Sequence, residues 1–323
     1  MRAGLVAAAV VATLAVLLAA ATAVEARRSA ALAEHGVARR VAVTGGALNV
    51  VVLEPRGPAS GRTLLLLHGA SGNLKDLELS IGRRLARRHR VVLVDRPGHG
   101  RSDRLGGREM ASPARQGAAI LQALDAIGVR RVVAVGHSWS GALATSLALD
   151  HPDRVVGLVT LAGATHPWPG GVAWYNSVAA TPLFGDLFAA TVVAPVGLAT
   201  FDKAVASVFA PASPPPDYVA RTDARLLLRP SEFRANAQDL KDLKPFLEAQ
   251  APRYGAIRQP TLIVTADVDA TVSPTLHSRA LHRQVAGSKL VVLPGAGHMP
   301  HWSATGRVVA EIDALALRAA PDR

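Results

Sequence analysis

The sequence contains no cysteine among its 323 residues. This absence excludes a disulfide framework, a zinc site built on thiolates and a cysteine nucleophile. Aromatic residues are also scarce, at 4%, and the 24 acidic residues are outnumbered by 36 lysines and arginines, which gives a formal net charge of +12. Because no basic run is interleaved with aromatic residues, this charge indicates a solvated, arginine-rich surface, and we predict no nucleic-acid partner.

Hydrophobic residues, by contrast, make up 50% of the chain, enough for one large domain with an insertion. The first 26 residues form a separate segment, in which an uncharged run extends from Ala3 to Val24. Its small residues at positions 21, 23 and 26 are typical of a cleavage site, whereas its length of about 20 residues is enough to span a bilayer. We therefore predict that residues 1–26 are a signal peptide or an N-terminal membrane anchor, and that the protein is exported (periplasmic or secreted) or anchored to the membrane.

Beyond this segment, short apolar runs alternate with helical patterns. Residues 37–43 and 48–53 flank a Gly-Gly turn and predict a hairpin. Apolar runs predict strands at residues 63–67, 91–94, 131–135, 155–161, 260–265 and 289–293, and the continuous runs at 63–67 and 91–94 are typical of strands buried on both faces. Helical spacing predicts helices at residues 74–88, 112–127, 141–148, 274–285 and 303–317. This alternation predicts an α/β fold with a mostly parallel central sheet of about eight strands and helices on both faces.

Residues 166–249 interrupt the alternation. They hold most of the aromatic side chains and the proline-rich stretch 211–216, and they show no strand pattern. We predict that they form a helical cap, or lid, over one edge of the sheet. Residues 37–165 and 250–323 are then the core of the domain.

Ser138 lies at the centre of the most informative stretch. Residues 131–142 predict a strand, a sharp turn and a helix, with Ser138 at the apex of a Gly-x-Ser-x-small pattern. Such a turn exposes the serine hydroxyl above the end of the sheet and directs the amide of Trp139 at the same space. The neighbours of the serine must be small, and Gly136 and Ser140 satisfy this requirement.

A serine hydroxyl needs a base to take its proton, and the base needs a partner that orients it. Asp267 and Asp269 follow one predicted strand, and His298 follows the next, so the chain order is serine, acid, histidine. A glycine-rich loop after the strand at 63–67 offers free amides near Ala70. With the amide of Trp139, this loop would form an oxyanion hole.

These motifs resemble those of the α/β-hydrolase superfamily. The resemblance covers about residues 37–165 and 250–323. It rests on residues 68–72, 95–102, 136–141 and 295–301, and on Asp269, which is followed in the sequence by Val272 and Pro274. The spacing to those last two residues implies that Asp269, rather than Asp267, is the acid. Three positions depart from the usual pattern, all with small replacements: Ser140, Ala266 and Ser303.

The resemblance is strongest to lidded serine esterases, carbon–carbon bond hydrolases and cofactor-free haloperoxidases. It implies a serine hydrolase with a Ser138–His298–Asp269 triad and an oxyanion hole at Ala70 and Trp139, which cleaves a carboxylic ester through an acyl-enzyme. We expect the substrate to be a small-molecule ester with an apolar acyl or alcohol part, and we expect no cofactor. We also expect no metal, because no histidines and carboxylates in the sequence have the spacing of a metal site.

The alternatives are a carbon–carbon bond hydrolase or haloperoxidase with the same triad, or a non-catalytic ligand-binding protein. The remaining candidates are predicted to support loops or pack: His68, Asp95, His99, His137 and His301.

Overall fold

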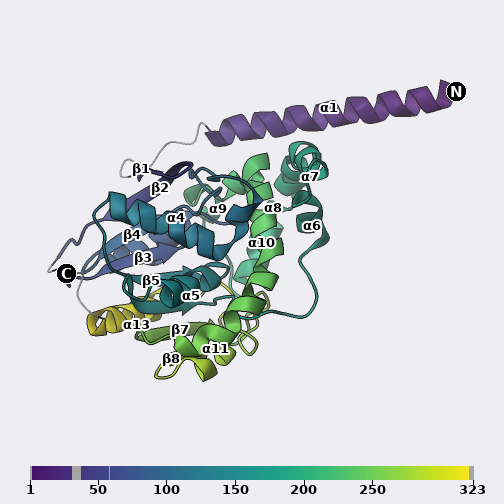
Figure 1. Ribbon diagram of the computed structural model, residues 1–323. Helices are drawn as coiled ribbons and strands as arrows, with labels where there is room; N and C mark the ends of the chain where they lie inside the picture. The colour runs from purple at the N-terminus through teal and green to yellow at the C-terminus, as the bar shows by residue number, and fades with distance from the viewer. Residues whose placement is uncertain (1, 31–37, 58, 320–323) are drawn as a thin grey trace.

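A mixed eight-stranded sheet forms the centre of the computed structural model, which describes residues 2–30, 38–57 and 59–319 (Figure 1). The strands are β1 (Ala38–Val43), β2 (Gly46–Leu53), β3 (Thr63–Leu67), β4 (Arg90–Val94), β5 (Val132–His137), β6 (Val155–Leu161), β7 (Thr261–Ala266) and β8 (Lys289–Leu293). Their order across the sheet is β1-β2-β4-β3-β5-β6-β7-β8. Strand β2 runs in the opposite direction to the other seven strands, so the predicted mostly parallel sheet is confirmed.

Helices pack on both faces of this sheet. In the core they are α2 (Leu74–Leu77), α3 (Arg83–Leu85), α4 (Pro113–Ala126), α5 (Ser140–Asp150), α11 (Ser278–Gln284), α12 (Pro300–Ser303) and α13 (Thr305–Arg318), with the short turns η1 (Glu78–Gly82), η2 (Arg108–Ala111) and η5 (Ala251–Ala256). Apolar side chains of α4, α5 and α11 form one buried cluster with the sheet. Those of α2, α3 and α13 form another. The central strands β3, β5 and β6 are buried along their whole length, which explains their continuous apolar sequences.

Three of the predicted helices are more irregular than expected. The helix predicted at 74–88 ends at Leu85 and contains the wide turn η1, where the hydroxyl of Ser80 bonds the carbonyl of Asp76 and competes with the backbone. The helix predicted at 274–285 begins only at Ser278, after a turn in which the amide of Arg279 bonds the carbonyl of Pro274, five residues back. The helix predicted at 303–317 is found as α13 and begins at Thr305, because the chain breaks at Ala304, which separates α13 from the short helix α12 before it.

Between β6 and β7, the described chain forms only helices and loops. The helices are α6 (Trp174–Ala179), α7 (Phe184–Phe188), η3 (Ala189–Val193), α8 (Ala194–Phe209), α9 (Tyr218–Arg221), η4 (Ala224–Leu228) and α10 (Pro230–Gln250). They gather at one end of the sheet in Figure 1, and part of them has its own apolar cluster, with Phe201 and Leu228. The stretch Phe184–Phe209 has the length and apolar composition of a membrane span, but such composition is also typical of a core helix.

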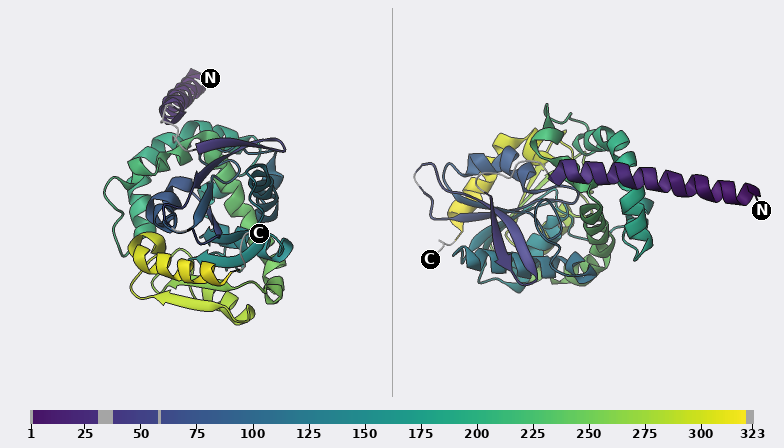
Figure 2. Two further views of the ribbon diagram at one scale, coloured as in Figure 1. Left: turned by 90° about the vertical axis from the view of Figure 1, so that its left-hand side faces the viewer. Right: turned by 90° about the horizontal axis from the view of Figure 1, so that it is seen from above.

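The N-terminal segment forms the long helix α1 (Arg2–Ala30). This helix contacts η3 and α8 of the cap and extends well beyond the rest of the molecule (Figures 1 and 2). Several of its large apolar side chains are exposed to solvent, among them Val10, Val16 and Leu17. The beginning of the predicted hairpin, residue 37, lies outside the described residues.

Candidate active site

Ser138 lies at a sharp turn between β5 and α5. Its backbone φ is 52°, a left-handed value that is strained for a residue with a side chain. A Cβ added at Gly136 would lie 2.1 Å from the carbonyl oxygen of Ser140, and one at Gly141 would lie 2.6 Å from the Cα of Gly163. The turn therefore tolerates no side chain at these two glycines, as the sequence pattern predicts.

The three residues predicted as a triad lie in one hydrogen-bonded chain. His298 Nε2 is 2.9 Å from Ser138 Oγ, and His298 Nδ1 is 2.9 Å from Asp269 Oδ2. His298 and Asp269 are buried, whereas Ser138 is partly exposed. This is the geometry in which a carboxylate orients an imidazole and the imidazole can take the serine proton.

The structure also separates the two candidate acids. The second oxygen of Asp269 accepts hydrogen bonds from the amides of Thr271 and Val272, at 2.8 and 2.9 Å, which fixes the carboxylate. Asp267 instead accepts a hydrogen bond from the amide of Gly295, at 2.7 Å. Asp267 therefore braces the turn before His298, while Asp269 contacts the imidazole itself.

The two amides predicted as an oxyanion hole belong to Ala70, after β3, and Trp139, after Ser138. Within the described residues, neither amide donates a hydrogen bond to the protein, so both are available to a ligand. The next amide, of Ser71, donates to the side chain of Asn236 on α10 at 2.7 Å. Ser140, one of the unusual residues, donates its hydroxyl to the carbonyl of His68 and so ties the two loops together.

A buried ion pair holds these loops against the cap. The Arg96 guanidinium is fully buried, lies 2.6 Å from Asp239 of α10 and packs 4.0 Å from the centre of the Trp139 ring. The indole nitrogen of Trp139 donates to the carbonyl of Asp239 at 3.0 Å. Arg96 also donates to the carbonyl of Gly69. Because a buried charge needs a partner, this pair fixes α10 relative to both proposed oxyanion loops.

His68 supports the same region, as predicted. Its Nδ1 lies 2.8 Å from the carbonyl of Gly69, and its Nε2 accepts the amide of Arg96 at 3.0 Å. Burial and the nearby Arg96 charge lower the pKa of His68 to about 3, so the ring is neutral and can accept this bond. Asp95 is also structural, because its carboxylate accepts bonds from the backbone amides of Leu74 and Arg101.

A cavity of about 980 Å³ opens above the triad. This volume is at the upper end of the range typical of small-molecule sites. Its walls are mostly apolar side chains of the cap, including Phe188, Val196, Phe201, Leu227 and Phe233. Among the described residues that line it, none is lysine or arginine.

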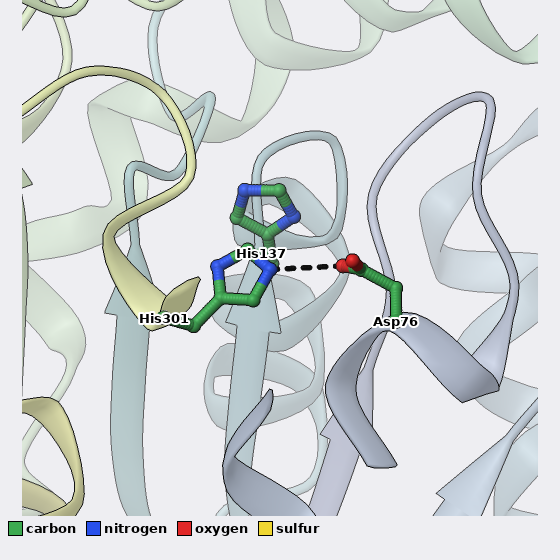
Figure 3. A group of neighbouring side chains, drawn as sticks. All are labelled: Asp76, His137 and His301. Atoms are coloured by element: carbon green, nitrogen blue, oxygen red, sulfur yellow. Dashed lines mark hydrogen bonds and ion pairs between the residues drawn. The ribbon is translucent and has the colours of Figure 1, made fainter. Parts of the chain in front are cut away.

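One polar cluster near the triad was not anticipated from the sequence. Asp76, His137 and His301 are buried together, and each offers one potential metal-ligand atom within 4.8 Å of the others (Figure 3). Asp76 carries no local motif, and its partners lie up to 226 residues away in the sequence. The only signal available was an acidic residue in the buried turn that follows Asn73. His137 and His301 pack against each other as predicted, and His301 is in addition hydrogen-bonded to Asp76.

An open α/β sheet that presents a hydrogen-bonded serine, histidine and aspartate at its strand ends, beneath a helical cap, is the architecture of a hydrolase. The chain belongs to the alpha/beta hydrolase fold family, whose profile matches residues 62–305. The family resemblance of the sequence motifs is thus confirmed.

The similar proteins have different substrates. The chain is 28% identical over 285 residues to 2-hydroxy-6-oxo-6-phenylhexa-2,4-dienoate hydrolase of Burkholderia cepacia, covering 84% of this chain and 93% of that protein. Among solved structures, it is similar to a membrane phospholipase A described as a novel bacterial virulence factor, with 26% identity, 99% coverage of both chains and a TM-score of 0.60. It shares its fold with the enol-lactonase of Burkholderia xenovorans LB400. The identity is 21%, the alignment covers 86% of this chain and 99% of the lactonase, and the TM-score is 0.63.

Proposed function

We propose that the protein hydrolyses a carboxylic ester through an acyl-enzyme. The observation that carries this proposal is the continuous chain from Asp269 through His298 to Ser138, at 2.9 Å for each hydrogen bond. Ser138 Oγ attacks the ester carbonyl carbon while its proton passes to His298 Nε2. The amides of Ala70 and Trp139 stabilise the resulting oxyanion. His298 then protonates the leaving alcohol, and a water deprotonated by His298 releases the acid.

The cavity favours an uncharged acyl ester over a carboxylate substrate. Burial of a carboxylate costs several kcal/mol unless a cation or several donors pair with it. None of the described lining residues is lysine or arginine, and Asp76 contributes a negative charge. The dienoate named for the Burkholderia cepacia relative is such a carboxylate, whereas a phospholipase A and an enol-lactonase act on esters. Ester hydrolysis is therefore our first proposal, and carbon–carbon bond hydrolysis is the second.

A series of p-nitrophenyl esters tests this proposal. We expect kcat/KM to rise with acyl chain length from acetyl towards long chains, by up to about fourfold for each methylene group that enters the cavity. A monoester of a dicarboxylic acid with the same chain length is the matched control, and its kcat/KM is expected to be at least about tenfold lower, because its carboxylate finds no cation. A preference for the carboxylated ester, or faster turnover of a carbon–carbon bond substrate, would contradict the proposal.

We also propose that residues 3–24 direct the protein out of the cytoplasm or hold it in a membrane. At 1.5 Å per residue, the uncharged residues 3–24 of α1 extend about 33 Å, compared with roughly 30 Å for the hydrocarbon core of a bilayer. Supporting this, the similar membrane phospholipase A aligns over 99% of this chain, so its likeness includes most of this segment. Uncharged, exposed apolar side chains on α1 are unfavourable in water.

Fractionation of the native host, followed by sequencing of the mature N-terminus, tests this location. A cleaved signal peptide is expected to give a chain that begins near residue 24 or 27 in the exported fraction. An anchor is expected to give an intact chain that stays with the membranes after an alkaline carbonate wash. An intact chain in the soluble cytoplasmic fraction would be incompatible with both versions.

A further inference from the structure

A buried carboxylate lies behind the segment that carries His298. Asp76, on α2, is only 4% exposed. One of its oxygens lies 2.9 Å from His301 Nε2, and the other accepts a hydrogen bond from Trp302 Nε1 at 2.7 Å. Since His301 and Trp302 follow His298 by three and four residues on the short helix α12, Asp76 fixes the backbone that carries the proposed base.

His137 contacts the same segment from the side of the nucleophile. It immediately precedes Ser138, and its Nε2 lies 3.1 Å from the carbonyl oxygen of His298, which is a donor geometry for that nitrogen. Its ring centre lies 4.3 Å from that of His301 (Figure 3). It lies 5.1 Å from that of His298. Burial, together with the nearby histidines, lowers the pKa of His137 well below its usual value, so the ring is neutral. The loops of nucleophile and base are therefore connected through His137.

Asp76 is stabilised as an anion by its neighbours. Burial alone would raise its pKa, but the interaction with His301 and the hydrogen bond from Trp302 hold the pKa of Asp76 below its ordinary value. The Tyr218 hydroxyl is a further donor, at 2.9 Å. A carboxylate with this many donors needs no metal ion to be satisfied, which accounts for the close approach of ligand-type atoms in this cluster.

Tyr218 brings the cap into this network. It begins α9, and its ring packs against Trp302, with 5.5 Å between the ring centres. Two neighbouring contacts hold the same part of the cap on α2: Lys75 pairs with Asp223, and Asn73 donates to the carbonyl of Thr222 at 2.8 Å. The hydroxyl of Tyr218 can therefore donate its hydrogen bond to Asp76 only while this part of the cap lies against the core.

We propose that Asp76 is a positioning residue for His298, and that Tyr218 makes the alignment of this base depend on the closed cap. The inference rests on the proposed function, because it assigns His298 as the base for Ser138. Asp76 acts through His301 and Trp302 and does not touch the reacting atoms. Its loss is expected to slow the chemical step more than it weakens substrate binding.

Kinetics of Asp76→Asn and Tyr218→Phe on a soluble p-nitrophenyl ester test the proposal. We expect Asp76→Asn to lower kcat by at least about thirtyfold and Tyr218→Phe by about threefold to tenfold, with KM changed less than twofold in each. The rate of Ser138 labelling by a fluorophosphonate should fall in parallel. Lys289→Met is the control: it removes an ion pair with Glu311 within the core that involves neither Asp76 nor Tyr218, and its kcat is expected to stay within twofold of wild type.

A double-mutant cycle with Asp269→Asn separates positioning from a general structural role. If Asp76 acts through His298, Asp76→Asn should have a much smaller effect where the imidazole is already misoriented. The inference would be overturned, with the proposed function left intact, if Asp76→Asn lowered kcat equally in the wild-type and Asp269→Asn proteins. It would also be overturned if Asp76→Asn and Tyr218→Phe each kept the kcat of wild type. A metal-dependent enzyme would also overturn the inference. The sign would be that Zn²⁺ activates the wild-type protein, that EDTA reverses the activation and that Asp76→Asn abolishes it, because the cluster would then bind metal. Should Asp76→Asn fail to fold, Tyr218→Phe alone decides. A wild-type protein without esterase activity or labelling would instead refute the proposed function.

Discussion

Replacement of Ser138 by alanine is expected to abolish ester hydrolysis, with a fall in kcat on the order of a millionfold. The same result is expected for His298→Ala, because nucleophile and base act as one unit and the loss of either removes the acyl-enzyme route. Steady-state kinetics on a p-nitrophenyl ester provide the measurement. A fluorophosphonate should label the wild-type protein at Ser138, and peptide mass mapping identifies the site.

Ser140→Ala is the control for this experiment. It makes the same chemical change two residues further along and removes a buried hydrogen bond to the carbonyl of His68, but it leaves the proposed nucleophile in place. We expect activity within about tenfold of wild type, since the loss of one such bond affects mainly stability. If the folded wild-type protein is neither labelled nor active, the non-catalytic ligand-binding alternative is favoured.

Asp269→Asn is expected to lower kcat by about 10⁴-fold, with little change in overall fold. An amide at this position can still accept the amides of Thr271 and Val272 through its oxygen. Its NH₂ group would then face His298 Nδ1 and favour the tautomer that carries the proton on the wrong nitrogen. The measurement is kcat on the ester that the wild-type enzyme cleaves fastest.

Asp267→Asn is the paired comparison. Its side chain accepts a single amide bond from Gly295, which an asparagine oxygen can also accept, so we expect less than about a tenfold loss. The contrast between two aspartates two residues apart tests the assignment of the acid directly. A larger loss at position 267 than at position 269 would show that the acid has been wrongly assigned.

The strands and the three loops of the proposed triad could be predicted because their signals are local. The triad loops follow β5, β7 and β8. The strands β5 and β7 are short apolar runs buried on both faces, β8 is an apolar run at the edge of the sheet, and parallel strands bring their carboxyl ends to one edge. Helix ends were predicted less well. Where α11 begins depends on the wide turn at Pro274, and the division at Ala304 depends on how α12 packs, neither of which a hydrophobic period encodes.

The polar contacts between distant segments could not be predicted in this way. Asp76 meets Tyr218 and Trp302 from 142 and 226 residues away, and Arg96 meets Asp239 across 143 residues. No sequence motif marks such a pair, because its geometry exists only after the sheet and the cap have come together. The only sign of such a contact in the sequence is an acidic residue at a position where the helix is expected to be buried and apolar.

The attachment of α10 limits how this enzyme can be re-engineered by exchanging its lid. The apolar side chains of α6 to α8 provide much of the cavity wall, so substitutions there are expected to change the shape offered to an acyl chain while leaving the triad in place. Helix α10 is different, since Asn236 and Asp239 bind Ser71, Arg96 and Trp139. A chimera that replaces the whole insertion would therefore lose the support of the proposed oxyanion hole. The part of the cap that can be exchanged is therefore α6 to α8, whereas α9, with Tyr218, and α10 belong functionally to the catalytic domain.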